Sequence, residues 1–162
     1  DHRDLHLSIR RQRQMCIRDS GLTALATHPS VLKRRTFPTV LTPHDREFEK
    51  LTGSPPAADR CAAVRNAAQN SVVLLKGPTT LVSDPQGDLI FVRNANQRLA
   101  TAGTGDVLTG IIGALTRNTP AHLAAAAAAH WHGQAAQLAD PDMTASDLPS
   151  LLQSARSVMF ST

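Results

Sequence analysis

A glycine-rich turn that leads into a single carboxylate has the clearest chemical potential in this chain. The segment LATAGTGDVLTG contains the turn Gly103-Thr104-Gly105, then Asp106, and an apolar stretch follows at once. Such a turn entering a helix points several backbone amides at one place and binds anions there. A carboxylate would repel that anion if it were only a ligand. We therefore interpret Asp106 as a base beside a phosphate that the amides of residues 103–106 hold.

Two further loops carry polar side chains that can join this turn. Thr42-Pro43-His44 follows a short apolar segment, and Lys76-Gly77-Pro78-Thr79-Thr80 follows the apolar run SVVLL. Loops at the carboxyl ends of strands in an open α/β sheet line one crevice. Each loop also has a plain structural interpretation: a helix start at His44, a solvated strand end at Lys76, and tight packing at the glycine turn. Their occurrence together in this order favours a shared site.

Hydrophobic patterning predicts alternating strands and helices from residue 21 onward. We expect strands at 37–41, 71–76, 80–83 and 89–92, with a hairpin turn at 84–88. We expect a helix starting within 21–28, one opened by a Thr42 cap and ended by Gly53, and others at 57–70, 105–117, 121–138 and 146–154. Strands separated by helices indicate a doubly wound sheet with its active loops at the carboxyl ends of the strands.

Composition narrows the class of protein. The chain has 162 residues, of which 41% are hydrophobic and 19% charged, enough for one domain or a large part of one. The net charge of +4 comes mostly from the first 35 residues, and aromatic residues are few, which argues against nucleic-acid binding. Cys16 and Cys61 have no metal or redox spacing. With no long apolar run and no secretory signal pattern, we expect a cytoplasmic protein without membrane contacts.

The first twenty residues, DHRDLHLSIRRQRQMCIRDS, differ in pattern from the rest of the chain. They carry eight charges and follow no clean helix or strand period. The ending RQMCIRDS resembles translated sequencing-adapter read-through. We interpret residues 1–20 as non-native, with a genuine disordered tail as the alternative, and residues 21–162 as the folded part.

The glycine turn and the two loops together resemble the ADP/ATP-dependent (S)-NAD(P)H-hydrate dehydratases of the ribokinase-like superfamily, a family also called the carbohydrate-kinase-like domain. The resemblance covers about residues 21–155. The matching segments are Thr42-Pro43-His44-x-x-Glu47-Phe48-x-x-Leu51, Leu75-Lys76-Gly77-x-x-Thr80, Asn94-Ala95-Asn96, residues 99–110, His132-Gly133-x-Ala135-Ala136 and Ala145-Ser146-Asp147-Leu148.

This resemblance implies a ribokinase-like layered αβα fold with a mostly parallel central sheet, and it implies site roles by position. Asp106 is then the catalytic base, and Gly103, Thr104 and Gly105 supply the anion hole. The predicted nucleotide-binding residues are Lys76, Gly77, Pro78, Thr79, Thr80 and Gly105. The predicted substrate-binding residues are His44, Asn96 and Asp106. A Mg²⁺ ion is expected with the nucleotide, and its ligands are left unassigned.

The implied reaction restores NADH or NADPH from the S-epimer of its 6-hydroxy adduct, with ADP or ATP as phosphoryl donor. Hydroxide is a poor leaving group, so phosphorylation of the hydroxyl followed by loss of phosphate eases the elimination. Two alternatives stay open: a ribokinase-like kinase for a hydroxymethylpyrimidine or hydroxyethylthiazole alcohol, and an inactive nucleotide-binding fragment.

Length separates this chain from the family. Family members have roughly another hundred residues before the equivalent of Gly21, so we expect an N-terminally truncated, C-terminal portion of the domain. The family also implies a homo-oligomer, tetrameric in full-length members, and a fused or separate NAD(P)H-hydrate epimerase as partner.

Overall fold

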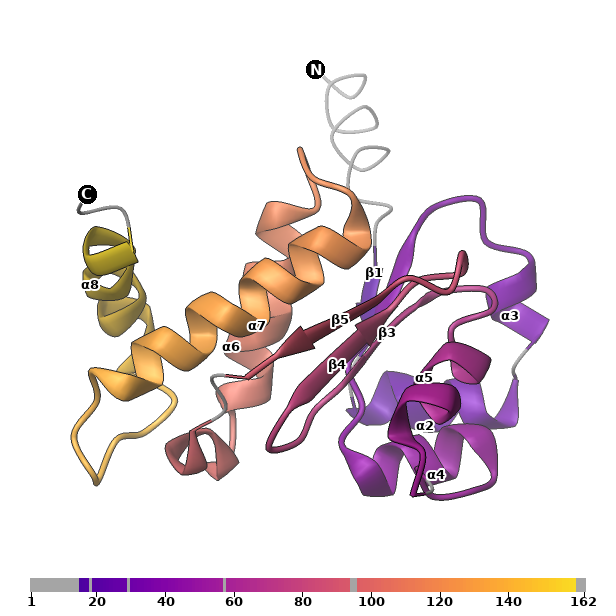
Figure 1. The fold of residues 1–162 in the computed structure, drawn as a ribbon, viewed down its shortest axis with the longest axis horizontal. Coiled ribbons are helices and arrows are strands. Elements are labelled where there is room, and N and C mark those ends of the chain that lie inside the picture. Colours follow the sequence, from indigo (N-terminus) through magenta and orange to yellow (C-terminus); the bar gives the residue numbers. More distant parts are fainter. Residues whose placement is uncertain (1–14, 18, 29, 57, 94–95, 160–162) are drawn as a thin grey trace, which may run out of the picture.

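A five-stranded sheet forms the centre of the molecule. The computed structural model describes residues 15–17, 19–28, 30–56, 58–93 and 96–159. The strands lie side by side in chain order: β1 (Met15–Ile17), β2 (Thr39–Leu41), β3 (Val72–Leu75), β4 (Thr80–Ser83) and β5 (Leu89–Val92) (Figure 1). Both pairings among β1, β2 and β3 are parallel, and both among β3, β4 and β5 are antiparallel.

The sheet is therefore mixed, and the expectation of a mostly parallel, doubly wound sheet is wrong for the β3–β5 half. The reason is the length of the connections. Residues 76–79 join β3 to β4, and residues 84–88 join β4 to β5. A parallel connection needs a crossover of a dozen or more residues, so loops this short form hairpins. The predicted hairpin turn at 84–88 is confirmed.

Helices cover both faces of the sheet. They are α2 (Asp19–Thr27), α3 (Ser30–Lys33), α4 (Asp45–Thr52), α5 (Arg60–Ala67), α6 (Thr104–Leu115), α7 (Ala121–Gln137) and α8 (Leu148–Met159), with a 3₁₀ turn η1 (Gln97–Ala100) before α6. Figure 1 shows α2, α4 and α5 on one side of the sheet and α6 and α7 on the other, with α8 beyond α7. The α/β fold class is confirmed.

Strand β3 divides the core between these two layers. Val72 and Leu74 pack with α6 and α7, whereas Val73 and Leu75 pack with α2, α4 and α5. All four side chains are buried because both faces are covered. This explains why the segment is a continuous apolar run instead of an alternating one.

Several boundaries differ from the expected ones. Helix α4 begins at Asp45 with His44 as its cap, and Thr42, the expected cap, is buried instead. Helix α5 begins at Arg60 behind an Asp59 cap, later than expected, and η1 was not expected. Residues 15–17 lie in β1 and residues 19–20 in α2, although both were assigned to the tail; residues 1–14 and 18 are outside the described part.

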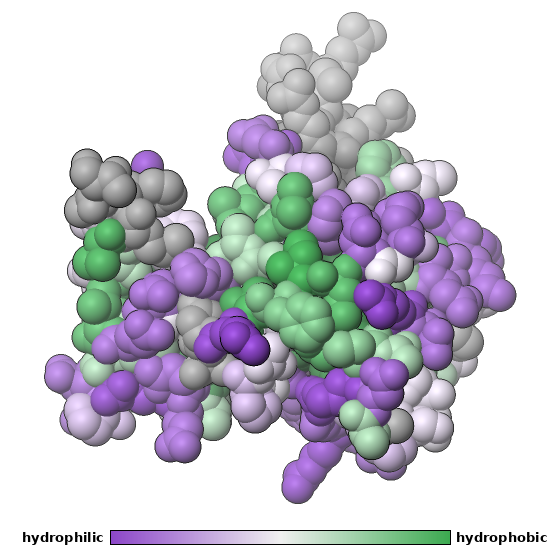
Figure 2. Space-filling view, viewed as in Figure 1, coloured by the Kyte–Doolittle hydropathy of each residue, from purple (hydrophilic) through white to green (hydrophobic). Residues whose placement is uncertain are grey.

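One face of the molecule carries exposed hydrophobic side chains. Figure 2 shows them gathered over the region of β5 and α7. Phe91 of the edge strand β5 and Leu123 of α7 are both exposed. Within the described residues, no helix has the length and apolar character needed to cross a membrane.

The alanine run of α7 lets this helix approach the sheet closely. Ala124, Ala125 and Ala128 have no exposed surface, whereas Ala127 is exposed. We expect Ala128→Leu to lower the free energy of unfolding by about 1–3 kcal/mol, because extra methylenes overpack a filled core. Ala127→Leu, one residue away, should change it by less than about 0.5 kcal/mol. Urea denaturation of both variants measures this, and equal effects would contradict the assigned packing of α7.

Candidate functional site

Two of the three predicted loops lie together because β2 and β3 are parallel neighbours. Both strands end at the same edge of the sheet, so the loop at 42–44 and the loop at 76–79 leave it side by side. The Lys76 amide donates a hydrogen bond to the Pro43 carbonyl at 2.9 Å. The two loops thus converge as expected, and a backbone hydrogen bond joins them directly.

Glu47 connects His44 to Lys76. The His44 amide donates to Glu47 Oε2 at 2.7 Å, and the Glu47 amide donates to His44 Nδ1 at 3.3 Å, which forms a capping box at the start of α4. Lys76 Nζ lies 3.4 Å from the same Oε2. One carboxylate oxygen therefore fixes the helix start and partners the lysine. The His44 side chain is 51% exposed, with Nε2 3.6 Å from Oε2.

The loop at 76–79, called the lysine loop below, is also held by a side chain of α5. Arg60 forms two hydrogen bonds to Asp45, at 2.8 and 2.9 Å, and its Nη2 donates to the Lys76 carbonyl at 3.4 Å. A Cβ at Gly77 would lie 2.9 Å from Nη2. A side chain at residue 77 would therefore require the Arg60 guanidinium group to move away from the loop backbone. Of the remaining predicted nucleotide residues, Pro78 is exposed, Thr79 is half-buried, and Thr80 opens β4 opposite Val92.

The glycine turn opens α6 as predicted. Gly103 is the N-cap, with φ of +86°, and a Cβ there would lie 3.0 Å from the Ala145 Cβ. The buried Thr104 hydroxyl donates to the Leu99 carbonyl at 2.7 Å and anchors the turn to η1.

Asp106 is exposed in the first turn of α6, where the helix dipole favours a negative charge. Two of the turn's amides already donate within the turn. The Asp106 amide donates to the Gly103 carbonyl at 3.0 Å, and the Thr104 amide donates to the Thr101 carbonyl at 3.4 Å. Asp106 is thus an exposed residue at the positive end of a helix whose start is fixed by short-range hydrogen bonds.

A buried histidine of α7 interacts with the glycine turn and feels the charge of the lysine loop. His132 is only 4% exposed. Burial lowers the pKa of His132 to about 4; a hydrogen bond with the Thr104 backbone opposes this shift, and the charge of Lys76 adds to it. Its imidazole is therefore hydrogen-bonded to the Thr104 backbone, is within the electrostatic influence of Lys76, and is neutral at pH 7.

Asn96 has a structural role at the other end of the turn segment. Its Oδ1 accepts from the Arg98 amide at 3.0 Å and caps η1, and its Nδ2 donates to the Ala136 carbonyl at 3.2 Å. No role for Glu47 or His132 is predicted from the sequence. The capping-box spacing of His44 and Glu47 was a usable signal for the first, whereas the burial of His132 depends on tertiary packing.

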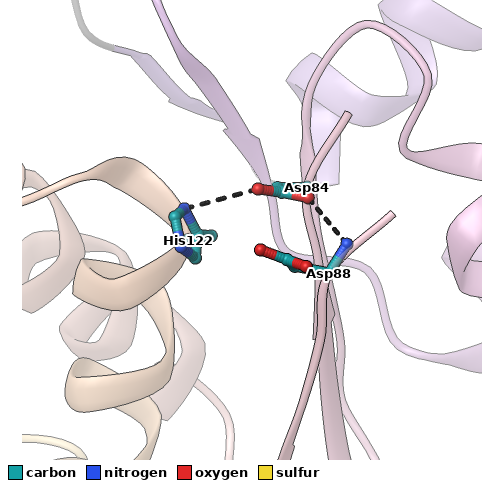
Figure 3. A group of neighbouring side chains, drawn as sticks. All are labelled: Asp84, Asp88 and His122. Atoms are coloured by element: carbon teal, nitrogen blue, oxygen red, sulfur yellow. Dashed lines mark hydrogen bonds and ion pairs between the residues drawn. The ribbon is translucent and has the colours of Figure 1, made fainter. Parts of the chain in front are cut away.

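The described residues contain one group of three side chains with metal-ligand chemistry: Asp84, Asp88 and His122, whose ligand atoms lie within 4.8 Å of one another (Figure 3). Asp84 Oδ1 accepts from the Asp88 amide at 3.0 Å, and Oδ2 lies 3.6 Å from His122 Nδ1. Because β4 is antiparallel to β3, this group lies at the opposite end of the sheet from Lys76. These three side chains are therefore too far from the glycine turn to bind a metal ion there.

The layered sheet and its loops define a class of α/β proteins. A ribokinase-like superfamily protein from Enterococcus faecalis superposes with a TM-score of 0.68 at 25% identity, over 88% of this chain and 53% of its own. An ADP/ATP-dependent NAD(P)H-hydrate dehydratase from Bacillus subtilis, co-crystallised with ATP/Mg²⁺ and soaked with CoA, gives 0.70 at 33% identity, over 77% of this chain and 50% of its own. The fold is ribokinase-like.

Sequence comparison identifies the family. The profile described as NAD(P)H-hydrate dehydratase matches residues 5–157. A bifunctional NAD(P)H-hydrate repair enzyme, Nnr, from Mycobacterium leprae is 47% identical over 133 residues, 80% of this chain and 28% of the relative. An ADP-dependent (S)-NAD(P)H-hydrate dehydratase from Neisseria meningitidis serogroup B is 46% identical over 105 residues, 61% of this chain and 36% of the relative. This chain belongs to the NAD(P)H-hydrate dehydratase family and spans only part of the length of these relatives.

Protonation of His132 should weaken the fold in acid. Its pKa is about 4 in the folded protein and about 6.5 when unfolded, so the unfolded chain binds more protons between these values. The stability associated with the neutral ring is fully present above pH 6.5 and is lost as the pH falls toward 4, by up to about 3 kcal/mol. Urea unfolding from pH 7 to 4.5 should show this loss of stability in the wild type and in the control His130→Asn, which lies on the exposed side of α7. The loss should be absent in His132→Asn. Parallel curves for all three would contradict the assignment.

Proposed function

We propose that this protein dehydrates the S-epimer of NAD(P)H hydrate to NAD(P)H, with ADP or ATP as phosphoryl donor. The observation that carries the proposal is the glycine turn that opens α6 with Asp106 in its first turn, in a chain of this family that also has Lys76 directly after β3. A lysine at the end of a central strand, together with a helix N-terminus that carries an exposed carboxylate, is suited to phosphoryl transfer. That reaction needs positioning and charge stabilisation more than covalent chemistry.

Asp106 is the base in the first step. Its carboxylate takes the proton of the substrate 6-hydroxyl, and the hydroxyl oxygen attacks the terminal phosphorus of the nucleotide. The bond from phosphorus to the bridging oxygen breaks, and AMP leaves when ADP is the donor, or ADP when ATP is. In the second step the lone pair of the ring nitrogen expels inorganic phosphate, and loss of a proton from the neighbouring ring carbon restores the double bond.

Of the three residues predicted to form the anion hole, Gly103 and Gly105 are better placed to bind phosphate than Thr104. Because the Thr104 amide already donates to the Thr101 carbonyl, we assign phosphate binding mainly to the amides of Gly103 and Gly105. Thr104 contributes by anchoring the turn through its hydroxyl.

Lys76 supplies a point charge to the nucleotide phosphates. Its side chain is 26% exposed and its Nζ lies 3.4 Å from Glu47 Oε2, so the ammonium can approach a phosphate while Glu47 limits where it moves. Together with residues 77–80 it forms the proposed nucleotide loop, and the exposed His44 ring contacts the hydrated nicotinamide. We leave Asn96 as a proposed substrate contact, although both ends of its amide are bonded to the backbone.

A Mg²⁺ ion is proposed to accompany the nucleotide. Mg²⁺ in phosphate sites keeps several waters and is bound largely by the phosphates themselves, which suits a turn where the described residues offer no cluster of three ligands. A homo-oligomer and an epimerase partner are proposed on the basis of the family and of the bifunctional relatives.

The purified protein should restore NADH absorbance at 340 nm when it is given (S)-NADH hydrate and ADP, with release of AMP and phosphate. The competing candidate is a ribokinase-like kinase for a small alcohol, because the same glycine turn serves that reaction. The two are separated by adding a hydroxymethylpyrimidine or hydroxyethylthiazole alcohol with ATP. Phosphorylation of the alcohol without any recovery of NADH would overturn the dehydratase assignment.

Replacing the base should remove turnover and spare nucleotide binding. We expect Asp106→Asn to lower kcat by about 10²–10⁴-fold, because the amide cannot accept the hydroxyl proton. Its dissociation constant for ADP, measured by calorimetry, should change little or tighten, since a negative charge near the phosphates is lost. Asp88→Asn, an exposed carboxylate at the opposite end of the sheet, is the matched control. Unchanged kcat in the Asp106 variant would show that another group is the base.

A further inference from the structure

His132 has a buried nitrogen that nothing in the proposed reaction explains. Among the described residues, Nε2 of His132 and the Ser71 hydroxyl are the buried side-chain atoms without a hydrogen-bond partner. Ser71 precedes β3, away from the lysine loop, whereas the His132 ring is hydrogen-bonded to the backbone of Thr104 in the glycine turn and is influenced by the charge of Lys76. Buried polar atoms are almost always paired, so an unpaired one inside a candidate site indicates a partner that arrives with a ligand.

The surroundings of His132 restrict what it can do. A neutral imidazole has one donor and one acceptor nitrogen, and here the ring is hydrogen-bonded to the Thr104 backbone. Thr104 itself is fixed, because its hydroxyl donates to the carbonyls of Leu99 and Thr101. Burial and the charge of Lys76 both disfavour a protonated ring, so His132 acts here as an uncharged hydrogen-bonding group.

We propose that His132 is a positioning residue for the nucleotide site: it sets the glycine turn relative to Lys76, and its Nε2 gains a hydrogen-bond partner when the nucleotide binds. The partner is a group ordered by the phosphates, such as a bound water or the Lys76 ammonium drawn away from Glu47. His132 does not exchange protons with the substrate. The proposal rests on the proposed nucleotide site and does not depend on which substrate receives the phosphoryl group.

Three variants on α7 test the positioning role. His132→Leu keeps a similar volume and removes both ring nitrogens, and His132→Asn keeps an uncharged donor and acceptor. His130→Leu is the matched control, because His130 is exposed on the same helix. We expect His132→Leu to weaken ADP binding about tenfold, the effect of losing one buried hydrogen bond, and to lower kcat as the turn moves relative to Lys76. His132→Asn should recover most of both losses, and His130→Leu should match the wild type.

A direct measurement on the wild type complements the variants. In ¹⁵N-histidine-labelled protein, the His132 ring should be neutral from pH 5.5 to 8, and its Nε2 resonance should shift when ADP is added. This reports on the hydrogen bond itself and decides the question even where a variant fails to fold.

The outcomes separate this proposal from the proposed function. An Nε2 resonance that ADP leaves unmoved, a folded His132→Leu with wild-type ADP affinity, or His132→Asn as impaired as His132→Leu would each overturn the positioning role. If ADP binds and His132→Leu weakens it while NAD(P)H hydrate is not converted, the dehydratase assignment fails and the positioning role stands. If the wild type does not bind ADP at all, both fail.

Discussion

The parallel pairing of β2 with β3 is the constraint on which the site depends. Because the two strands run in the same direction, their following loops leave at one edge, where the Lys76 amide bonds to the Pro43 carbonyl. Burial of both faces of β3 maintains this pairing, since neither Leu74 nor Leu75 can slip to solvent without losing a core contact. The geometry of the candidate site is therefore set by a strand whose four side chains are all buried, although the polar side chains of the site lie in the loops outside the sheet.

Charge is distributed around this edge so that each ionised group has a partner or a favourable field. Glu47 lies against Lys76 and at the same time completes the start of α4. Asp106 lies at the positive end of α6, and His132 between the two loops stays neutral. The proposed reaction would use these two charges separately, Lys76 for the nucleotide phosphates and Asp106 for the substrate hydroxyl.

The sequence predicts the local parts of this site better than the contacts among them. The glycine turn before α6, the hairpin turn at 84–88 and the buried run of β3 all follow from short-range patterns, and the structure has each of them. A threonine before proline commonly starts a helix, so the local sequence predicts Thr42 as the cap of α4. In the structure packing buries Thr42, and His44 is the cap.

Contacts between distant segments leave no periodic signal. Arg60 against Gly77 joins α5 to the lysine loop, and nothing in either local sequence indicates it. His132 lies in an alanine-rich helix whose faces are nearly alike in composition, so hydrophobic periodicity could not tell which histidine of α7 is buried. The hairpin turn at 84–88 predicts the antiparallel pairing of β4 with β5, whereas the equally short connection at 76–79, which makes β3 and β4 antiparallel, conflicts with the mostly parallel sheet that the family resemblance implies.

Exposure separates the groups that must meet a ligand from those that hold them. His44, Lys76 and Asp106 reach solvent, whereas Thr104 and His132 are almost completely buried. Phosphoryl transfer asks little covalent chemistry of a protein and much positional accuracy. A side chain that only positions others gains from burial, because packing restricts its rotamers and a low dielectric strengthens its hydrogen bonds. A base, by contrast, must stay accessible to the proton it removes. The division between buried and exposed side chains is therefore the arrangement that the proposed chemistry requires, and it suits the buried His132 to a positioning role instead of that of a second base.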